Sequence, residues 1–218
     1  KNLFLLKQID VFQNYPDHKS LDNVLDAVFD NYYKDWNYKY IIDRGPAGTD
    51  GNLKLVKKHL NPNIKIIFLF RPILEVLASW IDWANKTPDN YLRREGTPTQ
   101  ACHKLMSEEG QIVKELRFMH NLLKPENKHH VLFVNYDEIV DKPKQTIDSI
   151  YKFLGIPKFK HRFKNFKQIE VNGLKYDDTI FGKGMHTINT KSLVKTKRDI
   201  TKILPQEIID KYGKIKFI

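Results

Sequence analysis

The chain has almost no cysteine and no long hydrophobic run, and these two absences exclude several classes of protein. Its 218 residues include a single cysteine, Cys102, so an internal disulfide and a zinc site built from several cysteines are both excluded. No apolar run is long enough to cross a bilayer, and no signal-peptide pattern is present. We therefore expect a soluble, cytoplasmic protein, with any segment before Lys1 left open.

Internal repeats and low-complexity linkers are also lacking. The length fits one domain over residues 1–218, and a composition of 41% hydrophobic and 29% charged residues is ordinary for a globular protein. Lysine and arginine number 37 against 26 aspartates and glutamates, which gives a formal charge of +11. This excess favours an anionic partner, and nucleotide, nucleic acid, sulfated glycan and anionic membrane all remain open.

Short β-branched runs alternate with amphipathic stretches along the chain. An alternation of strands and helices predicts parallel strands joined by crossover helices, and we expect an α/β protein, a three-layer sandwich with a central parallel sheet. The predicted strands cover 3–6, 38–42, 65–70 and 131–134. The predicted helices cover 21–33 (capped by Ser20 or Asp22), 52–60, 72–81, 101–123, 144–154 and 205–212, with a loop over 85–100.

Ligands of parallel sheets bind at the carboxyl ends of the strands. The loops that follow Ile42, Phe70 and Val134 should meet there, which predicts that Arg44, Arg71 and Tyr136 lie near one site.

Arg71 stands between a strand that reads as buried on both faces and a predicted helix. A helix N-terminus offers free N–H groups to an anion, and arginine adds a permanently charged, bidentate donor. Ser79 lies about two turns further on, so its hydroxyl is placed to share one anion with the guanidinium. The alternative is a surface arginine and a helix serine that packs against a neighbour.

The loop from Asp43 to Gly51 contains three glycines but lacks the Gly-Lys-Ser/Thr ending of a nucleotide P-loop. This counts against a nucleotide kinase. The glycines allow backbone to approach a ligand, although a flexible turn explains them equally well.

Taken together, four segments resemble the sulfotransferase family that uses 3′-phosphoadenosine-5′-phosphosulfate. Residues 65–80 look like its 3′-phosphate-binding strand and helix, with Arg71 followed by Ser79. Residues 135–157, Asn-Tyr-Asp-Glu-Ile through Phe-Leu-Gly-Ile-Pro, are similar to its downstream Tyr-Glu-Asp-Leu and Phe-Leu-Gly block. Arg44-Gly45-Pro46 resembles its Lys-Thr/Ser-Pro, and Lys183-Gly184 with His186 resembles its late Lys-Gly element. The resemblance covers about residues 38–190.

The resemblance implies a P-loop-NTPase-like sulfotransferase fold, 3′-phosphoadenosine-5′-phosphosulfate as donor, and a hydroxyl or amine acceptor. Arg71 and Ser79 would bind the 3′-phosphate, Tyr136 would border the nucleotide, and Lys183 and Gly184 would contact the same phosphate. Arg44 would replace the usual lysine beside the sulfonate.

The resemblance does not single out one general base, and one element of the family, the phosphosulfate loop, has no counterpart in the sequence. Asp10 is our first choice of base, because some glycan-sulfating members keep theirs in that region; Asp43, Asp50 and His186 are alternatives. The Gly/Ser/Thr-rich phosphosulfate loop of the family is not found, so we expect either that it precedes Lys1 or that this member is degenerate.

Three other features have structural as well as functional interpretations. The histidines form no metal-binding pattern, and Trp80, Trp83 and Tyr91 are expected as core or cleft wall. The run over 158–167 interleaves basic and aromatic residues, and a solvated basic face, a site for a sulfated or phosphorylated acceptor and a site for single-stranded nucleic acid are all open. The alternative function is accordingly a non-catalytic, nucleic-acid- or nucleotide-binding module.

Overall fold

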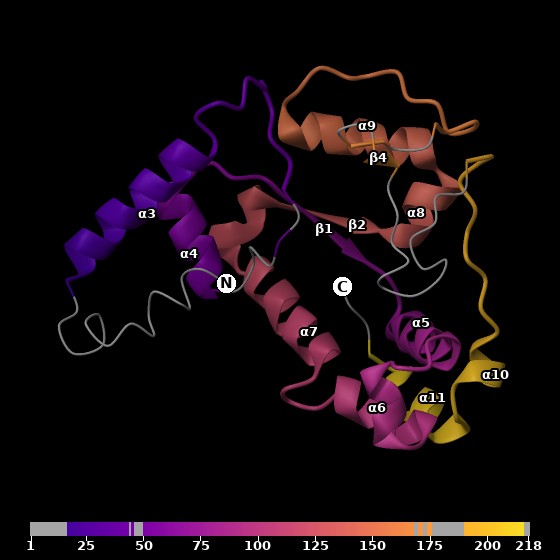
Figure 1. The fold of residues 1–218 in the computed structure, drawn as a ribbon. Helices are drawn as coiled ribbons and strands as arrows, with labels where there is room; N and C mark the ends of the chain where they lie inside the picture. The colour runs from indigo at the N-terminus through magenta and orange to yellow at the C-terminus, as the bar shows by residue number, and fades with distance from the viewer. Residues whose placement is uncertain are drawn as a thin grey trace. The chain divides into compact units, whose positions relative to one another are not determined.

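In a computed structural model of the chain, the described residues are 17–43, 45, 50–167, 170–171, 174–175 and 190–215. They divide into two compact units, one within residues 1–64 and the other from Lys65 to Ile218. Figure 1 shows the course of the chain. The predicted strand over 3–6 lies outside the described residues.

The first unit contains helices α3 (His18–Tyr32) and α4 (Asp50–His59), as the apolar spacing predicted. The cap of α3 differs from the prediction of Ser20 or Asp22. Asp17 precedes the helix, and its Oδ1 accepts hydrogen bonds from the backbone N–H groups of Lys19 and Ser20. An aspartate in this position satisfies N–H groups that have no partner inside the helix, so the helix begins earlier than predicted.

His59 connects the two helices of the first unit. Its side chain is 1% exposed, its Nδ1 lies 2.7 Å from Asp26 Oδ1, and its Nε2 lies 3.1 Å from Asp22 Oδ1. Lys58 also pairs with Asp22. Asp22 and Asp26, one turn apart on α3, thus bind the C-terminal end of α4 through Lys58 and His59.

The predicted strand over 38–42 is wrong, because these residues belong to no strand. Tyr38 is 73% exposed and Ile42 is 88% exposed. Strand-forming side chains do not by themselves make a strand, since the backbone needs a neighbouring strand to receive its hydrogen bonds.

The second unit is built on two parallel strands, β1 (Ile66–Phe70) and β2 (Val131–Asn135). Their register pairs Ile66 with Val131 and Phe70 with Asn135. This confirms the predicted parallel pairing and an α/β class. Leu69 is 59% exposed, so β1 is not buried on both faces along its whole length, as the sequence had suggested.

Two helices, α7 and α9, contact residues in or next to β1. The ring of Phe68 in β1 lies 5.6 Å from that of Phe118 in α7 (Gln111–Leu122). At the start of the strand, Lys65 Nζ lies 4.9 Å from the ring centroid of Phe153 in α9 (Pro143–Leu154). The helix predicted over 144–154 is confirmed, and it ends at Gly155, whose φ of 67° is left-handed.

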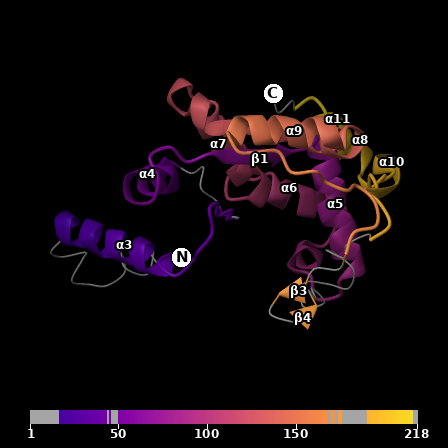
Figure 2. The ribbon, with the colours of Figure 1, turned by 90° about the horizontal axis from the view of Figure 1, so that it is seen from above.

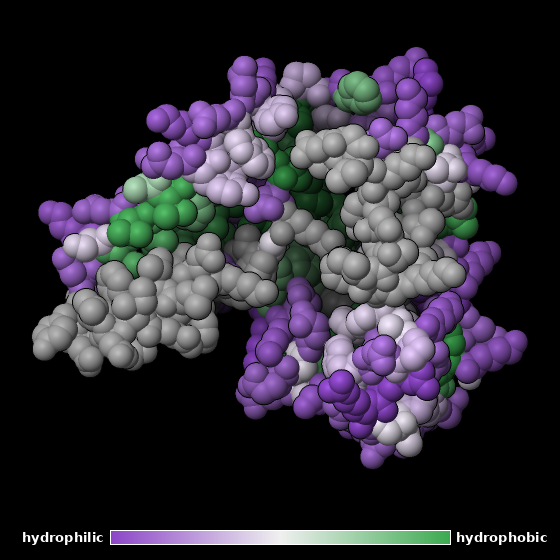
Figure 3. Space-filling view, in the orientation of Figure 1, coloured by the Kyte–Doolittle hydropathy of each residue, from purple (hydrophilic) through white to green (hydrophobic). Residues whose placement is uncertain are grey.

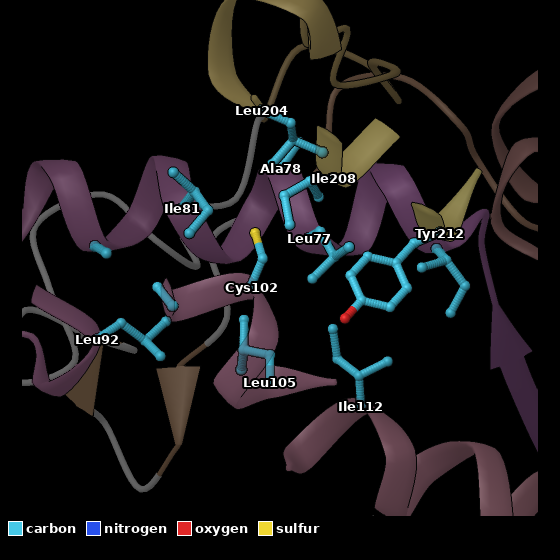
Figure 4. Packing of buried hydrophobic residues seen from close by; sticks show 13 residues of the cluster. Leu77, Ala78, Ile81, Leu92, Cys102, Leu105, Ile112, Leu204, Ile208 and Tyr212 are labelled. Atoms are coloured by element: carbon cyan, nitrogen blue, oxygen red, sulfur yellow. The ribbon is translucent and has the colours of Figure 1, made fainter. Parts of the chain in front are cut away.

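The main core surrounds α5 (Ile73–Lys86), which follows β1 after Arg71 and Pro72. Figure 4 shows its buried side chains packed against those of three other helices: α6 (Pro98–Leu105), α7 and α11 (Gln206–Tyr212). Leu77, Cys102 and Ile208 are each fully buried. The N-terminal half of α5 is therefore held rigidly beside the end of β1.

The single helix predicted over 101–123 is wrong, because α6 ends at Leu105 and α7 begins at Gln111. At the break, a Cβ on Gly110 would lie 2.2 Å from the backbone oxygen of Leu105. Glycine permits this close approach. The predicted loop over 85–100 also contains the 3-10 helix η1 (Tyr91–Glu95) and the first turn of α6.

The remaining elements are short. They are the 3-10 helix η2 (Pro125–His130), α8 (Tyr136–Asp141), the antiparallel pair β3 (Glu170–Val171) and β4 (Leu174–Lys175), and α10 (Ile200–Ile203). Figure 2 shows the strand pair β3–β4 from above. Within the described part of the chain, no helix has the length and apolar character needed to span a bilayer.

Candidate functional site

Arg71 and Tyr136 meet where the two parallel strands end. Phe70 and Asn135 are partners in the ladder, so the next residue of each strand emerges at the same edge of the sheet. The guanidinium carbon of Arg71 lies 4.3 Å from the centroid of the Tyr136 ring. This confirms the prediction that the two residues lie close together, and a cation–π contact holds the arginine in place.

Arg71 keeps part of its hydrogen-bonding capacity free. Its Nη2 lies 3.4 Å from Oε2 of Glu75, which is in the first turn of α5. Its Nε is buried and has no hydrogen-bond partner among the described residues. An unsatisfied buried donor on a charged group costs free energy, so an acceptor at this position would bind favourably.

Ser79 lies on α5 and is partly buried. Glu75 and Ser79 are four residues apart in α5, which places them on one face of the helix. Arg71 precedes the helix and pairs with Glu75, so the carboxylate at the start of this face lies next to the arginine, and Ser79 is one turn further on.

Lys195 adds a second cation to this region. Its Nζ lies 2.9 Å from Asp137 Oδ2 and 3.8 Å from Asp141 Oδ2. The hydrogen bond to Asp137 and the charges of Asp137, Asp141 and Glu75 raise the lysine's pKa against a smaller opposing effect of desolvation. Since Asp137 directly follows Tyr136, Lys195 attaches the C-terminal segment to the neighbour of the residue that contacts Arg71.

Arg198 fastens the same segment to the middle of α5. Its Nε lies 3.3 Å from Asp82 Oδ2, and Lys86 pairs with the same carboxylate at 2.9 Å. Burial alone would raise the pKa of Asp82, but the hydrogen bonds from Lys86 and Arg198 lower it. The aspartate therefore stays ionised and bound at neutral pH.

Several predicted site residues lie outside the described part of the chain. These are Arg44, Asp10, Lys183, Gly184 and His186; for Asp50, the first residue of α4, the structure describes the backbone alone. Their assignments therefore remain predictions.

Asp43, an alternative general base, lines a cavity of about 270 Å³ in the first unit. The other lining residues are mainly aromatic and aliphatic: Val28, Phe29, Tyr32, Tyr33, Trp36, Ile41 and Ile42. Burial and the charge of Asp43 raise the pKa of Tyr33. The phenol consequently stays protonated at neutral pH.

Trp80, Trp83 and Tyr91 form one aromatic cluster. The two tryptophan rings lie 5.3 Å apart, and each is 6.5 Å from the tyrosine ring. Trp80, on α5, packs against the core, while Tyr91 is 44% exposed. The expected core role is confirmed for Trp80, and a role as cleft wall stays a prediction.

Cys102 is fully buried in the main core. Burial raises the pKa of its thiol to about 11, so the thiol stays protonated at neutral pH and is a poor nucleophile. Among the described residues, no group of three or more potential ligands is placed to hold a metal ion.

Three residues of the site were missed by the sequence analysis. Glu75 had a signal, because it stands in the first turn of the predicted helix, four residues after the arginine that precedes that helix. Asp137 follows Tyr136 directly, yet nothing marked it as an ion-pair partner. Lys195 had no signal at all, since its contact spans 58 residues of chain.

Comparison with known proteins adds one finding. Comparison with curated proteins and with solved structures gave no match. A family model of the sulfotransferase domain, however, matches residues 51–215, which is more than half of the chain. The match includes Arg71, Ser79 and Tyr136. The chain therefore belongs to the sulfotransferase domain family.

Proposed function

We propose that this protein transfers a sulfonate group from 3′-phosphoadenosine-5′-phosphosulfate to a hydroxyl or amine acceptor, and that Arg71 binds the 3′-phosphate of the donor. Membership of the family supports a transferase that acts on sulfonate groups. The observation that carries the donor assignment is the buried, unpartnered Nε of Arg71 at the strand edge beside Tyr136.

A phosphate oxygen is a suitable partner for that nitrogen. Charged phosphate accepts strong hydrogen bonds from a guanidinium, and the N-terminus of α5 favours negative charge next to it. Ser79 supplies a hydroxyl further along the same helix face. The ring of Tyr136 limits the positions that the guanidinium can adopt, which reduces the entropy lost when the phosphate binds.

We also propose a three-layer, P-loop-like sandwich for the part of the chain that carries these residues. Lys65 and Phe68 stand three positions apart, so their side chains leave opposite faces of an extended chain. One contacts α9 and the other contacts α7. Helices on both faces of a parallel sheet are the arrangement that such a sandwich requires.

The transfer needs a cation at the sulfonate and a base at the acceptor. The acceptor oxygen or nitrogen forms a bond to sulfur, the bond from sulfur to the bridging phosphate oxygen breaks, and that oxygen keeps the electron pair. We assign the cation to Arg44, which can stabilise the charge on the departing oxygen. We assign the base to Asp10, which would take the acceptor proton.

Isothermal titration calorimetry with 3′,5′-adenosine bisphosphate tests the donor site. The unmodified chain should bind this nucleotide, and Arg71→Ala should weaken binding by about 1.5–3 kcal/mol, or roughly 10- to 100-fold. Ser79→Ala should weaken it by about 1 kcal/mol, because it removes a single hydrogen bond.

Arg117→Ala is the matched control, since Arg117 is exposed on α7 and pairs with Glu108. It removes the same charge and should leave binding unchanged. Failure of the unmodified chain to bind the nucleotide, or equal binding by Arg71→Ala, contradicts the proposed donor site. Transfer itself is measured by the release of 3′,5′-adenosine bisphosphate from the donor in the presence of candidate acceptors.

A further inference from the structure

The segment that follows α9 carries a dense positive charge. Residues 158–167 contain four lysines and one arginine and no acidic residue. In Figure 3, the upper rim of the view, where the chain after α9 runs, is mostly hydrophilic, with one hydrophobic patch among the hydrophilic residues. The chain is not helical here, and the contacts between its side chains show which of them lie on the same side.

The aromatic residues of this segment stack on one another. The His161 ring lies 5.1 Å from that of Phe159 and 6.2 Å from that of Phe163. His161 Nε2 also lies 2.8 Å from the hydroxyl of Tyr151 on α9. Rings two residues apart are therefore on one side of the chain, and that side is attached to the helix.

The cations alternate with these rings, so they lie on the other side. Lys160, Arg162 and Lys164 are all exposed. Lys158 pairs with Asp148 at 3.1 Å. Among the described residues, no carboxylate lies within 4 Å of the other cations of the segment or of Lys152 on α9. At about 6.5 Å between alternate residues of an extended chain, Lys158, Lys160, Arg162 and Lys164 form a row of cations. Within the described part of the chain, Lys158 is the one member of this row that pairs with a carboxylate.

A backbone contact holds the row in place near its end. Lys164 forms an isolated bridge with Ser192, and the N–H of Asn165 donates to the backbone oxygen of Lys191. Together with the bond from His161 to Tyr151, this contact fixes the segment at two points. A row of cations that is already ordered loses little conformational entropy when it binds an anionic partner.

We propose that the row formed by Lys158, Lys160, Arg162 and Lys164 binds a sulfated polysaccharide chain. Sulfate esters keep their charge at any physiological pH, and a polysaccharide presents them repeatedly along an extended chain, as the row presents its cations. The choice of polysaccharide rests on the proposed function, because a sulfotransferase that acts on a glycan would meet its own sulfated product.

Two other polyanions fit the structure less well. Single-stranded nucleic acid binds through several rings whose faces are open for bases to stack on. Here Phe163 is partly buried, and the exposed His161 ring is hydrogen-bonded to Tyr151 and lies between the rings of Phe159 and Phe163. An anionic membrane surface attracts basic clusters too, but lasting attachment also needs apolar side chains to insert, and this segment offers Phe159 for that role.

Binding to immobilised heparin, compared with its unsulfated counterpart heparosan, tests the proposal without donor or transfer. The unmodified chain should bind heparin more tightly than heparosan, and affinity should fall as salt increases. Lys160→Ala/Arg162→Ala/Lys164→Ala should weaken heparin binding tenfold or more. It should also lower the slope of log affinity against log salt by about two, since fewer counterions are released.

The matched control is Lys104→Ala/Lys128→Ala/Lys211→Ala, which removes the same charge from other exposed positions. Equal loss in both variants, or equal binding to heparin and heparosan, overturns the proposal. Tighter binding to an oligo-dT strand of equal charge that Phe159→Ala abolishes would identify nucleic acid, and tighter binding to phosphatidylserine vesicles would identify a membrane; either result also overturns it. Calorimetry with 3′,5′-adenosine bisphosphate on the same variants tests the donor site separately. A loss of heparin binding with unchanged nucleotide binding concerns the basic row alone.

Discussion

The guanidinium of Arg71 lies over the ring of Tyr136, with its carbon 4.3 Å from the ring centroid. The two residues are 65 positions apart, and the parallel register of β1 and β2 brings them together because each directly follows its strand. The arginine is thus oriented by the sheet itself. Its Nε, which has no hydrogen-bond partner among the described residues, is buried at the same edge.

The ring of Tyr136, rather than its hydroxyl, should therefore matter for the arginine. We expect Tyr136→Phe to keep the affinity for 3′,5′-adenosine bisphosphate within about twofold, whereas Tyr136→Leu should weaken it by about 0.5–2 kcal/mol, the range of cation–π contacts. Calorimetry measures both. A large loss in Tyr136→Phe would show instead that the hydroxyl contacts the nucleotide.

Glu75 competes with an anion for Arg71. Its Oε2 lies 3.4 Å from Nη2 of the arginine and carries a negative charge on the same helix face as Ser79. Glu75→Gln keeps an acceptor for the guanidinium but removes the repulsion, so affinity for the bisphosphate nucleotide should rise by a few fold at low salt. The gain should shrink at high salt, because screening weakens the repulsion. Weaker binding by this variant at both salt concentrations would mean that the carboxylate is needed to orient the arginine.

The sequence predicted the elements of this edge well because their signals are local. The apolar run before Arg71, the helical spacing after Pro72 and the second strand before Tyr136 each depend on neighbouring residues. The contact of the two side chains followed from the rule that parallel strands present their carboxyl ends together. The strand over 38–42 failed since its β-forming residues found no partner, which is a tertiary property.

The ion pairs of the C-terminal segment could not have been predicted in the same way. Lys195 and Arg198 stand among several similar cations in residues 191–202, and the sequence does not show which of them meets Asp137 or Asp82. The break between α6 and α7 at Gly110 could be predicted in part. A glycine inside a helical pattern is a weak signal, and the close approach to Leu105 that requires it is visible once the chain is folded.

The pair between Asp82 and Arg198 should make stability depend on acid pH. The pKa of Asp82 is lowered in the folded chain from a usual value of 3.8, so its contribution is complete above that value and is lost as pH falls through the lower, folded pKa. Asp82→Asn should reduce the free energy of unfolding by about 0.5–1 kcal/mol at pH 7. Urea unfolding at pH 7 and near pH 3 should show a smaller difference between the two proteins in acid. A difference that is the same at both pH values would rule out the ion pair as its source.

Two glycines should respond differently to substitution, because different constraints require them. At Gly110 a Cβ would lie 2.2 Å from the Leu105 backbone oxygen, whereas at Gly155 nothing lies within 4 Å and the constraint is a φ of 67°. Gly110→Ala should cost about 1–3 kcal/mol through overpacking, and Gly155→Ala about 1–2 kcal/mol through the left-handed backbone. Asparagine tolerates that backbone, so Gly155→Asn should recover much of the loss measured by urea unfolding, while Gly110→Asn should recover none. Recovery at Gly110 would mean that α6 and α7 can separate there, and that the break between them is not fixed by this contact.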